Sequence, residues 1–268
     1  MEDPKTVQAY AITLSGQRMH FWKGGTGPGL LLLHAAWGDA EMSWSSVWGR
    51  LSRSCTIIAP DLPGFGQTSP IRNPSLQAMA KQLKELFDAL HMDRVVVVGN
   101  SFGAAVAIQF ANDYPEAVSH LVLVNGGYMP VIPGPVRKFM ALPIVNRGFR
   151  RLIRRLTFSL QTLKRSFVDI SKLPAGFFDT ILGSALAYSK ISFDTVMNMT
   201  APLAKPSVPT FLVWGAQDGL APLKQARALQ KWLPDSTLVT INGSGHMPQV
   251  ERPEEFVAAI MGMTKQVK

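Results

Sequence analysis

Short runs of β-branched residues and leucine alternate along the chain with longer segments in which apolar residues recur every three or four positions. The short runs predict β-strands, and the longer segments predict helices with one apolar face. Their alternation is typical of βαβ units, which build a mostly parallel sheet flanked by helices. The expected strands are 8–13, 18–22, 29–33, 56–60, 94–98, 120–124, 210–214 and 237–241.

The predicted helices lie between the later strands, whereas the first two strands are expected to form an antiparallel hairpin through Ser15 and Gly16. The clearest helix is 75–90, because its apolar residues fall on one face. These residues are Leu76, Met79, Leu83, Leu86, Phe87 and Leu90. Further helices are expected at 102–112, 224–232 and 253–263.

The alternation stops between residues 128 and 207, where no strand-like run occurs and the pattern becomes helical and punctuated by proline. We interpret 128–207 as a helical cap that is inserted into a core formed by 1–127 and 208–268. A chain of 268 residues is long enough for one α/β unit with such an insertion.

Positive charge is concentrated in this predicted cap. Residues 128–207 contain twelve Lys or Arg against three Asp, a net charge of +9 that equals the formal net charge of the whole chain. Solubility does not require the charge to lie in one segment, so a general solubility role does not explain the asymmetry. No RNA-binding or DNA-binding motif accompanies the charge, and we expect no nucleic-acid partner.

The composition, 47% hydrophobic and 17% charged, is that of a globular protein rather than a disordered one. The first five residues are acidic and polar, unlike a secretory signal. The most apolar long window, 95–111, is interrupted by two glycines, Asn100 and Ser101, so no membrane-spanning helix is expected. Cys55 is the only cysteine, which excludes an intrachain disulfide and a cysteine cluster for zinc or iron. We expect a cytoplasmic protein; its oligomeric state is left open.

The segment Gly99-Asn100-Ser101-Phe102-Gly103 matches the pattern G-x-S-x-G between a predicted strand and a predicted helix. In that context a sharp turn exposes the serine hydroxyl, and the glycines allow the backbones to approach closely. Free N–H groups at the start of the helix stabilise a developing negative charge. The pattern predicts Ser101 as a catalytic nucleophile, although the five residues alone also fit a tight turn with an incidental serine.

A serine nucleophile needs a base to remove its proton, and His246 is the best placed histidine. It lies in a glycine-rich loop between the last predicted strand and the last predicted helix. The competing histidines lie within or beside predicted elements and are more simply structural; they are His20, His91 and His120.

The third member of a catalytic triad is expected between Ser101 and His246 along the chain, because the strand-turn-helix context carries that order. Asp218 follows the strand 210–214 and meets this condition. Its alternative role is to form a turn or cap the next helix. Asn125 follows the strand before it but offers no carboxylate.

Five ordered motifs resemble those of the α/β-hydrolase superfamily, in its cap-bearing esterase and carbon-carbon hydrolase branch. They are 31–34, 61–66, the serine motif 99–103, 214–222, and 245–249 continuing to 251–253. The likeness covers nearly the whole chain except the cap. It implies an α/β-hydrolase fold, with a mostly parallel eight-stranded sheet, flanking helices and an inserted helical cap, and a chemistry that needs no metal or cofactor.

The resemblance also implies an oxyanion hole built from the N–H of Phe102 and an N–H from the loop after His34. The family usually has His-Gly in that loop, whereas this chain has His34-Ala35-Ala36-Trp37. By position Ala36 is expected to be the second donor, and an insertion would instead place Trp37 there.

Haloalkane dehalogenases and epoxide hydrolases resemble this chain but use Asp as the nucleophile, so Ser101 argues against both. We favour a carboxylesterase that cleaves small to medium acyl esters through an acyl-enzyme. One alternative is a carbon-carbon hydrolase of ring-fission diketones, which Asn100 favours; the residues after His34, and Met247 in place of Trp, disagree with it. Another is a ligand receptor of the same fold with negligible turnover.

The segment 148–156 repeats a pair of arginines every four residues with apolar residues between them. On a helix this spacing predicts two stripes. The basic stripe is Arg150, Arg151, Arg154 and Arg155, and the apolar stripe is Phe149, Leu152, Ile153 and Leu156. The apolar stripe is expected to close the substrate pocket while the arginines face water. Weak contact of the arginines with an anionic membrane surface or an acidic substrate is the alternative.

Overall fold

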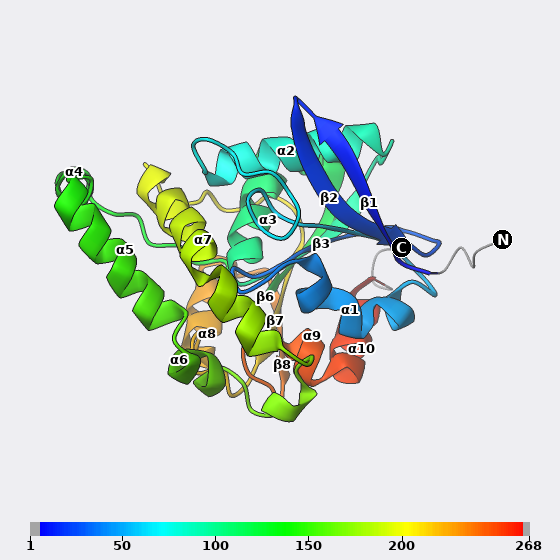
Figure 1. Cartoon of the computed structure of the whole chain (residues 1–268). Helices are drawn as coiled ribbons and strands as arrows, with labels where there is room; N and C mark the ends of the chain where they lie inside the picture. The colour runs from blue at the N-terminus through cyan, green and yellow to red at the C-terminus, as the bar shows by residue number, and fades with distance from the viewer. Residues whose placement is uncertain (1–5, 265–268) are drawn as a thin grey trace.

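The computed structural model describes residues 6–264 and shows an eight-stranded sheet with helices on both faces (Figure 1). The strand order is β1-β2-β4-β3-β5-β6-β7-β8. β2 is antiparallel to both of its neighbours, and all other neighbours are parallel. The strands are β1 Gln8–Leu14, β2 Gln17–Gly24, β3 Gly29–Leu33, β4 Thr56–Pro60, β5 Val95–Asn100, β6 Val118–Val124, β7 Thr210–Gly215 and β8 Thr237–Ile241.

All eight predicted strands occur, and the mostly parallel sheet expected from the sequence is confirmed. The predicted hairpin through Ser15 and Gly16 joins β1 to β2. The largest differences, of two residues at one end, are at β2, which extends to Gly24, at β5, which extends to Asn100, and at β6, which begins at Val118. Residues 1–5, which the sequence analysis finds unlike a secretory signal, lie outside the described residues.

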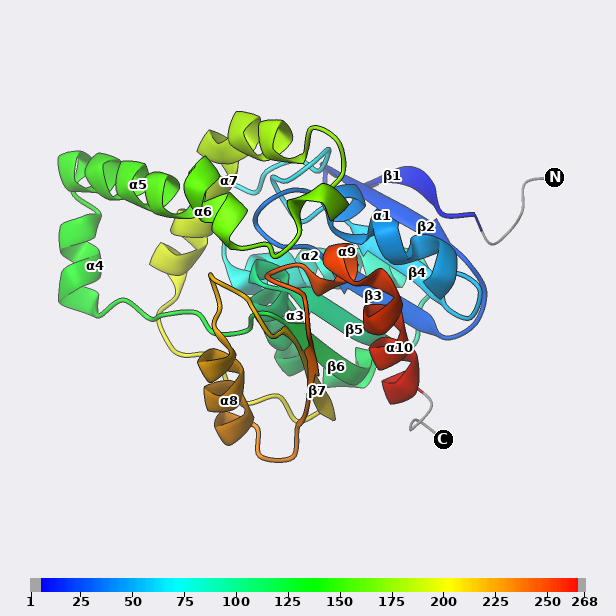
Figure 2. The same cartoon turned by 90° about the horizontal axis from the view of Figure 1, so that it is seen from below.

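Helices cover both faces of the sheet. On one face lie α2 Leu76–Ala89, α3 Phe102–Asp113 and α8 Leu223–Trp232; on the other lie α1 Ala40–Leu51 and α10 Pro253–Thr264, preceded by the short α9 Pro248–Glu251. Figure 2 shows α1 and α10 on the side opposite α4 and α5. The four helices that the sequence predicts for the core are confirmed. Within residues 6–264, none of the helices combines the length and apolar character that crossing a membrane requires.

Helix α1 was not predicted, because its twelve residues include three serines and one glycine, which weaken a helical pattern. Its buried residues nevertheless recur at helical spacing, as Trp44, Val47, Trp48 and Leu51. The side chain of Asp39 accepts a hydrogen bond from the N–H of Met42 and so caps the start of the helix.

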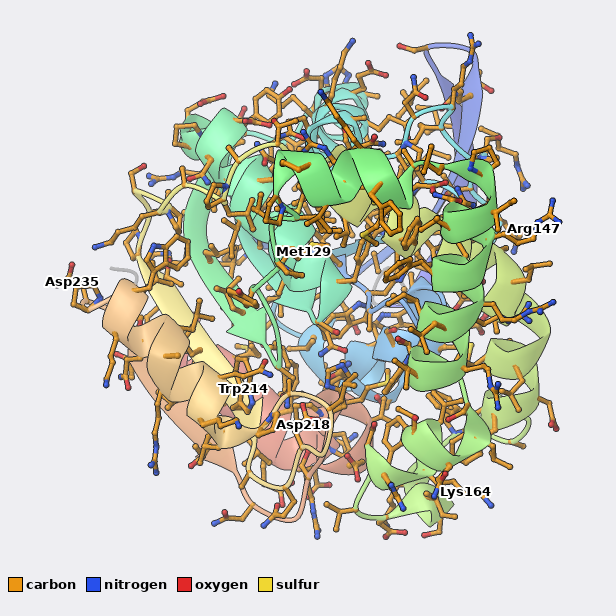
Figure 3. The ribbon with its side chains drawn as sticks, turned by 90° about the vertical axis from the view of Figure 1, so that its left-hand side faces the viewer. Met129, Arg147, Lys164, Trp214, Asp218 and Asp235 are labelled. Carbon is orange, nitrogen blue, oxygen red and sulfur yellow. The ribbon has the colours of Figure 1, made fainter. Side chains whose placement is uncertain are left out.

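The segment 128–207 contains helices and no strand. They are α4 Gly134–Met140, α5 Pro143–Thr157, α6 Leu160–Arg165 and α7 Phe177–Asn198, with a 3-10 turn at Ile170–Lys172. In Figure 3, α5 stands at the edge of the molecule and Arg147 points away from the body of the protein. The division of the chain at 128 and 207 stays a prediction.

The two stripes predicted for α5 are wrong in part. Leu152 and Leu156, expected to face inward, are 49% and 59% exposed. Arg150, expected to face water, is half-buried and binds Asp194 of α7 at 2.6 Å. The reason is that α7 packs on the side of α5 that carries Arg150, which turns the two leucines outward.

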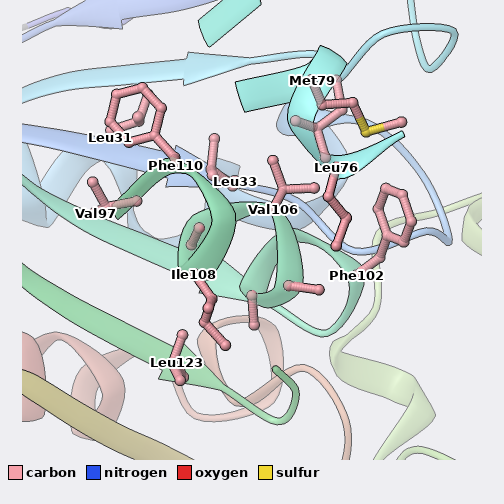
Figure 4. Packing of buried hydrophobic residues seen from close by; sticks show 14 of the residues in the cluster. Leu31, Leu33, Leu76, Met79, Val97, Phe102, Val106, Ile108, Phe110 and Leu123 are labelled. Atoms are coloured by element: carbon pink, nitrogen blue, oxygen red, sulfur yellow. The ribbon is translucent and has the colours of Figure 1, made fainter. Parts of the chain in front are cut away.

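The core forms because successive residues of a strand point to opposite faces. In β3, Leu31 and Leu33 pack against the α2 and α3 side, whereas Leu30 and Leu32 pack against the α1 and α10 side. Figure 4 shows Leu31 and Leu33 beside the apolar residues of α3. Burial on both faces explains why these strands are uninterrupted apolar runs. Because β5, β6 and β7 are parallel neighbours, their carboxyl ends lie at one edge of the sheet.

Candidate active site

Ser101 lies in the sharp turn between β5 and α3. Its backbone has φ 54° and ψ −109°, a conformation that costs free energy for a residue with a side chain. The turn is held by the N–H of Ser101, which donates to the carbonyl of Val124 at 2.8 Å. A Cβ on Gly103 would lie closer than 3.0 Å to the carbonyl oxygen of Leu33. The tight packing that the sequence motif predicts is therefore present.

The structure brings together the three residues predicted for the triad. Oγ of Ser101 lies 2.9 Å from Nε2 of His246, and Nδ1 of His246 lies 2.7 Å from Oδ2 of Asp218. An ionised carboxylate only accepts hydrogen bonds, so Nδ1 carries the proton and Nε2 is left to accept one from the serine. This arrangement lets His246 remove the hydroxyl proton of Ser101.

Asp218 is buried, with 4% of its surface exposed. Burial alone raises the pKa of its carboxyl, but the charge of His246 and the hydrogen bonds from His246, Ala221 and Asn125 lower the pKa below its ordinary value. Its Oδ1 accepts from the N–H groups of Leu220 and Ala221 at 2.8 and 2.9 Å. The carboxylate is thus kept ionised and fixed in orientation.

Asn125 is a residue of this site that the sequence interpretation missed. Its Nδ2 donates to Oδ2 of Asp218 at 2.6 Å, and its Oδ1 accepts from the N–H of Gly215 at 3.0 Å. The signal available in the sequence was its position at the end of β6, between the strands that carry Ser101 and Asp218. The sequence interpretation considered Asn125 only as a candidate for the acid of the triad and set it aside because it has no carboxylate.

Glu251 is a second missed residue, and it connects the helical segment 128–207 to the loop of His246. Its Oε2 accepts from the N–H of Gly245 at 2.7 Å, while its Oε1 accepts from the N–H groups of Val168 and Asp169 at 2.6 and 3.1 Å. Burial raises the pKa of this carboxyl, although those three hydrogen bonds oppose the shift. The sequence interpretation included Glu251 in the motif 245–253 but assigned it no role, because its partner Val168 lies 83 positions away.

The loop that precedes α1 reaches the same site. His34 is fully buried; its Nδ1 donates to the carbonyl of Ala35 at 2.7 Å, and its Nε2 accepts from the N–H of Leu62 at 2.8 Å. The ring of Trp37 packs against the ring of His246, with centroids 4.9 Å apart. Ala36 lies between these two residues and is half-buried, and Phe102 is the first residue of α3.

A cavity of about 400 Å³ opens over Ser101 and His246. Its walls include Tyr128, Met129 and Leu220, together with Thr157 at the end of α5. A second cavity of about 440 Å³ shares Tyr128, Met129, Gln225 and Leu229 with it and is otherwise lined mainly by apolar residues, among them Leu203 and Trp232. Figure 3 looks onto this side, where Met129 and Asp218 lie between α8 and α5. The cavities are not accompanied by a metal site: among the residues that the structure describes, no group of three or more His, Cys, Asp or Glu side chains is placed to hold a metal ion.

Comparisons with known proteins identify the family of this chain. A family model described as the alpha/beta hydrolase fold matches residues 28–253. The 2-hydroxy-6-oxononadienedioate/2-hydroxy-6-oxononatrienedioate hydrolase 2 of Pseudomonas putida is 30% identical over 249 residues, which cover 87% of this chain and 82% of that protein.

Two solved structures are similar over almost the whole chain. A membrane phospholipase A has a TM-score of 0.79 and 26% identity, covering 98% of this chain and 87% of its own. A thermophilic esterase from Thermogutta terrifontis has a TM-score of 0.75 and 25% identity, covering 97% of this chain and 99% of its own.

Proposed function

This chain belongs to the α/β-hydrolase fold family, and on that premise we propose that it is a serine hydrolase that cleaves carboxylic esters. The observation that carries the proposal is the continuous hydrogen-bonded path from Oγ of Ser101 through the ring of His246 to Asp218. A strained serine at the start of a helix supports it, because the hydroxyl is presented with free N–H groups beside it.

In the proposed reaction His246 takes the proton of Ser101 as Oγ attacks the ester carbonyl, and Asp218 stabilises the imidazolium. The imidazolium then gives its proton to the alcohol oxygen of the ester. The alcohol departs, and the acyl group stays bound to Ser101. Water, deprotonated by His246, releases the acid and restores the serine.

The negative charge that develops on the carbonyl oxygen is stabilised by hydrogen-bond donors that are already in position before the reaction. We propose the N–H of Phe102 and the N–H of Ala36 for this role. Phe102 follows Ser101 directly at the start of α3, and Ala36 lies in the loop that the hydrogen bonds of His34 hold. We choose Ala36 over Trp37 by its position in the loop, two residues after His34.

The apolar lining of the second cavity supports an ester with a small to medium acyl chain. The similarity to an esterase and to a phospholipase A is consistent with ester cleavage. The similarity to a Pseudomonas putida hydrolase whose name gives 2-hydroxy-6-oxo diacids as substrates supports carbon-carbon bond hydrolysis as the second candidate.

The two candidates are tested together by steady-state hydrolysis of p-nitrophenyl esters from acetyl to decanoyl and of a 2-hydroxy-6-oxo dienoate. We expect the highest kcat/KM on an ester and slow or no cleavage of the dienoate. A higher kcat/KM on the dienoate would assign the chain to the second candidate. Single-turnover acylation without steady-state turnover would instead identify a receptor with negligible catalysis.

A further inference from the structure

The net charge of +9 and the exposed apolar side chains occur in the same part of the molecule. Twelve of the fifteen large apolar side chains that are exposed among the described residues lie between positions 128 and 207, which also carry the whole positive excess. Exposed apolar residues on one segment mark an interaction surface. Their coincidence with Lys and Arg is typical of helices that lie in the headgroup region of a membrane.

Helix α5 concentrates both features on one side. We define its outer face as Ile144, Arg147, Arg151, Leu152, Arg155 and Leu156, all of which are exposed. Their spacing of three, four, seven and eight positions places them on one side of a helix. Ile144 is 88% exposed, so no other part of the described protein covers this end of the face.

The opposite side of α5 is held by the protein itself. Arg150 binds Asp194 at 2.6 Å and lies over the ring of Phe193 of α7. In contrast, the three arginines of the outer face have no ion-pair partner among residues 6–264. These three arginines can therefore pair with anionic groups of a binding partner.

We propose that the outer face of α5 docks on an anionic lipid bilayer, with its apolar side chains in the headgroup region and its arginines on lipid phosphates. A second copy of this chain fits less well, because pairing two caps would bring two net charges of +9 together. A nucleic acid would attract the arginines but gives no reason for exposed Ile144 and Leu156. Charge and apolar surface together therefore favour a membrane.

The position of the outer face relative to the cavity supports a lipid partner. Thr157, which follows Leu156 directly, lines the cavity over Ser101. The cavity over Ser101 therefore reaches the C-terminal end of the helix that carries the outer face, and a partner that contains apolar esters fits both features.

The experiment is vesicle sedimentation with the inactive Ser101→Ala protein, so that binding is measured without turnover. Vesicles of phosphatidylcholine alone are compared with vesicles that contain phosphatidylglycerol, at low and at raised salt. We expect binding to the anionic vesicles only, weakened by salt. Arg147→Gln, Arg151→Gln and Arg155→Gln combined are expected to weaken the partition coefficient by roughly 100-fold, since each basic residue contributes about fivefold.

The matched control removes three exposed basic residues outside the cap: Arg53→Gln, Arg72→Gln and Lys231→Gln. This variant has the same net charge and is expected to bind like the parent. A separate variant, Ile144→Ser, Leu152→Ser and Leu156→Ser, is expected to lose the binding that remains at raised salt.

Three results would overturn the proposal. They are equal binding to neutral and anionic vesicles, equal loss of binding in the control variant, and a dimer in sedimentation velocity that the serine variant abolishes, which would assign the face to a second copy. Hydrolysis of p-nitrophenyl acetate by the same variants with Ser101 restored shows independently whether each is folded.

Discussion

Nδ2 of Asn125 lies 2.6 Å from Oδ2 of Asp218, the same oxygen that lies 2.7 Å from Nδ1 of His246. The asparagine and the imidazole therefore hold the same oxygen of the Asp218 carboxylate. Because its own carbonyl oxygen accepts from the N–H of Gly215, its orientation is fixed by the backbone of β7.

Asn125→Ala is expected to lower kcat for a short ester by about tenfold with little change in KM, since a hydrogen bond to a buried charge is lost. Asn125→Asp is expected to lower kcat further, because a second carboxylate would face the carboxylate of Asp218. Asn112→Ala is the matched control; its amide donates to the carbonyl of Ala204 away from the site, and kcat should not change. Wild-type kcat in Asn125→Ala would contradict the assigned role.

Glu251→Gln tests the connection between the cap and the loop of His246. The amide replaces one accepting oxygen with a donor, so either Gly245 or the pair Val168 and Asp169 loses its acceptor. We expect a fall in kcat of about tenfold, since a buried N–H without a partner costs roughly 1–3 kcal/mol. Glu255→Gln, an exposed neighbour, should leave kcat unchanged. Equal kcat of Glu251→Gln and Glu255→Gln would show that the hydrogen bonds of Glu251 do not position His246.

The burial of His34 makes stability depend on pH. Burial lowers the pKa of its imidazole below 6.5, although Asp61 and the bond to Ala35 oppose the shift. Below about pH 6.5 the unfolded chain therefore binds a proton that the folded protein does not, and the free energy of unfolding falls as pH falls.

Urea unfolding at pH 7.5 and at pH 5.5 measures this effect. Since one proton is worth at most roughly 1.4 kcal/mol per pH unit, His34→Gln should reduce the loss of stability between the two pH values by no more than that amount per unit. His120, whose pKa is also lowered, by burial and by Arg94, remains in both proteins. An unchanged pH dependence in His34→Gln would mean that His34 is protonated in the folded state.

Gly103→Ala tests the packing beneath the serine turn. The added Cβ would lie closer than 3.0 Å to the carbonyl oxygens of Leu33 and His34, which are backbone atoms that cannot move aside. We expect a loss of about 3 kcal/mol or more in the free energy of unfolding. Gly183→Ala in α7 is the control, because a Cβ there has no atom within 4 Å, and it should add roughly 0.5–1 kcal/mol. Equal stability of the two variants would contradict the close contact of α3 with β3.

The sheet could be predicted from the sequence because a strand buried on both faces is a continuous apolar run, as in Leu30 to Leu33. Ser101 could be predicted because its motif is local and needs only the strand and helix beside it. Asn125 and Glu251 could not be assigned in this way, since their partners lie 93 and 83 positions away and no spacing links them.

The side of α5 that faces solvent could not be predicted for a similar reason. The periodicity of 148–156 defines two stripes, but Asp194 of α7 decides which one faces inward. The same holds for α1, whose helical state depends on burial of Trp44 and Trp48 against the sheet more than on its own serine-rich sequence.

The central claim, that Ser101 is the nucleophile, is tested most directly by intact-mass and peptide mass spectrometry after treatment with a fluorophosphonate. The account predicts one adduct per folded chain, located on Ser101, and none on the urea-unfolded protein. Ser101→Ala should take no adduct, keep its fold and lose hydrolysis by a factor on the order of 10⁴–10⁶. An adduct on another serine, or ester hydrolysis near the wild-type rate in Ser101→Ala, would contradict it.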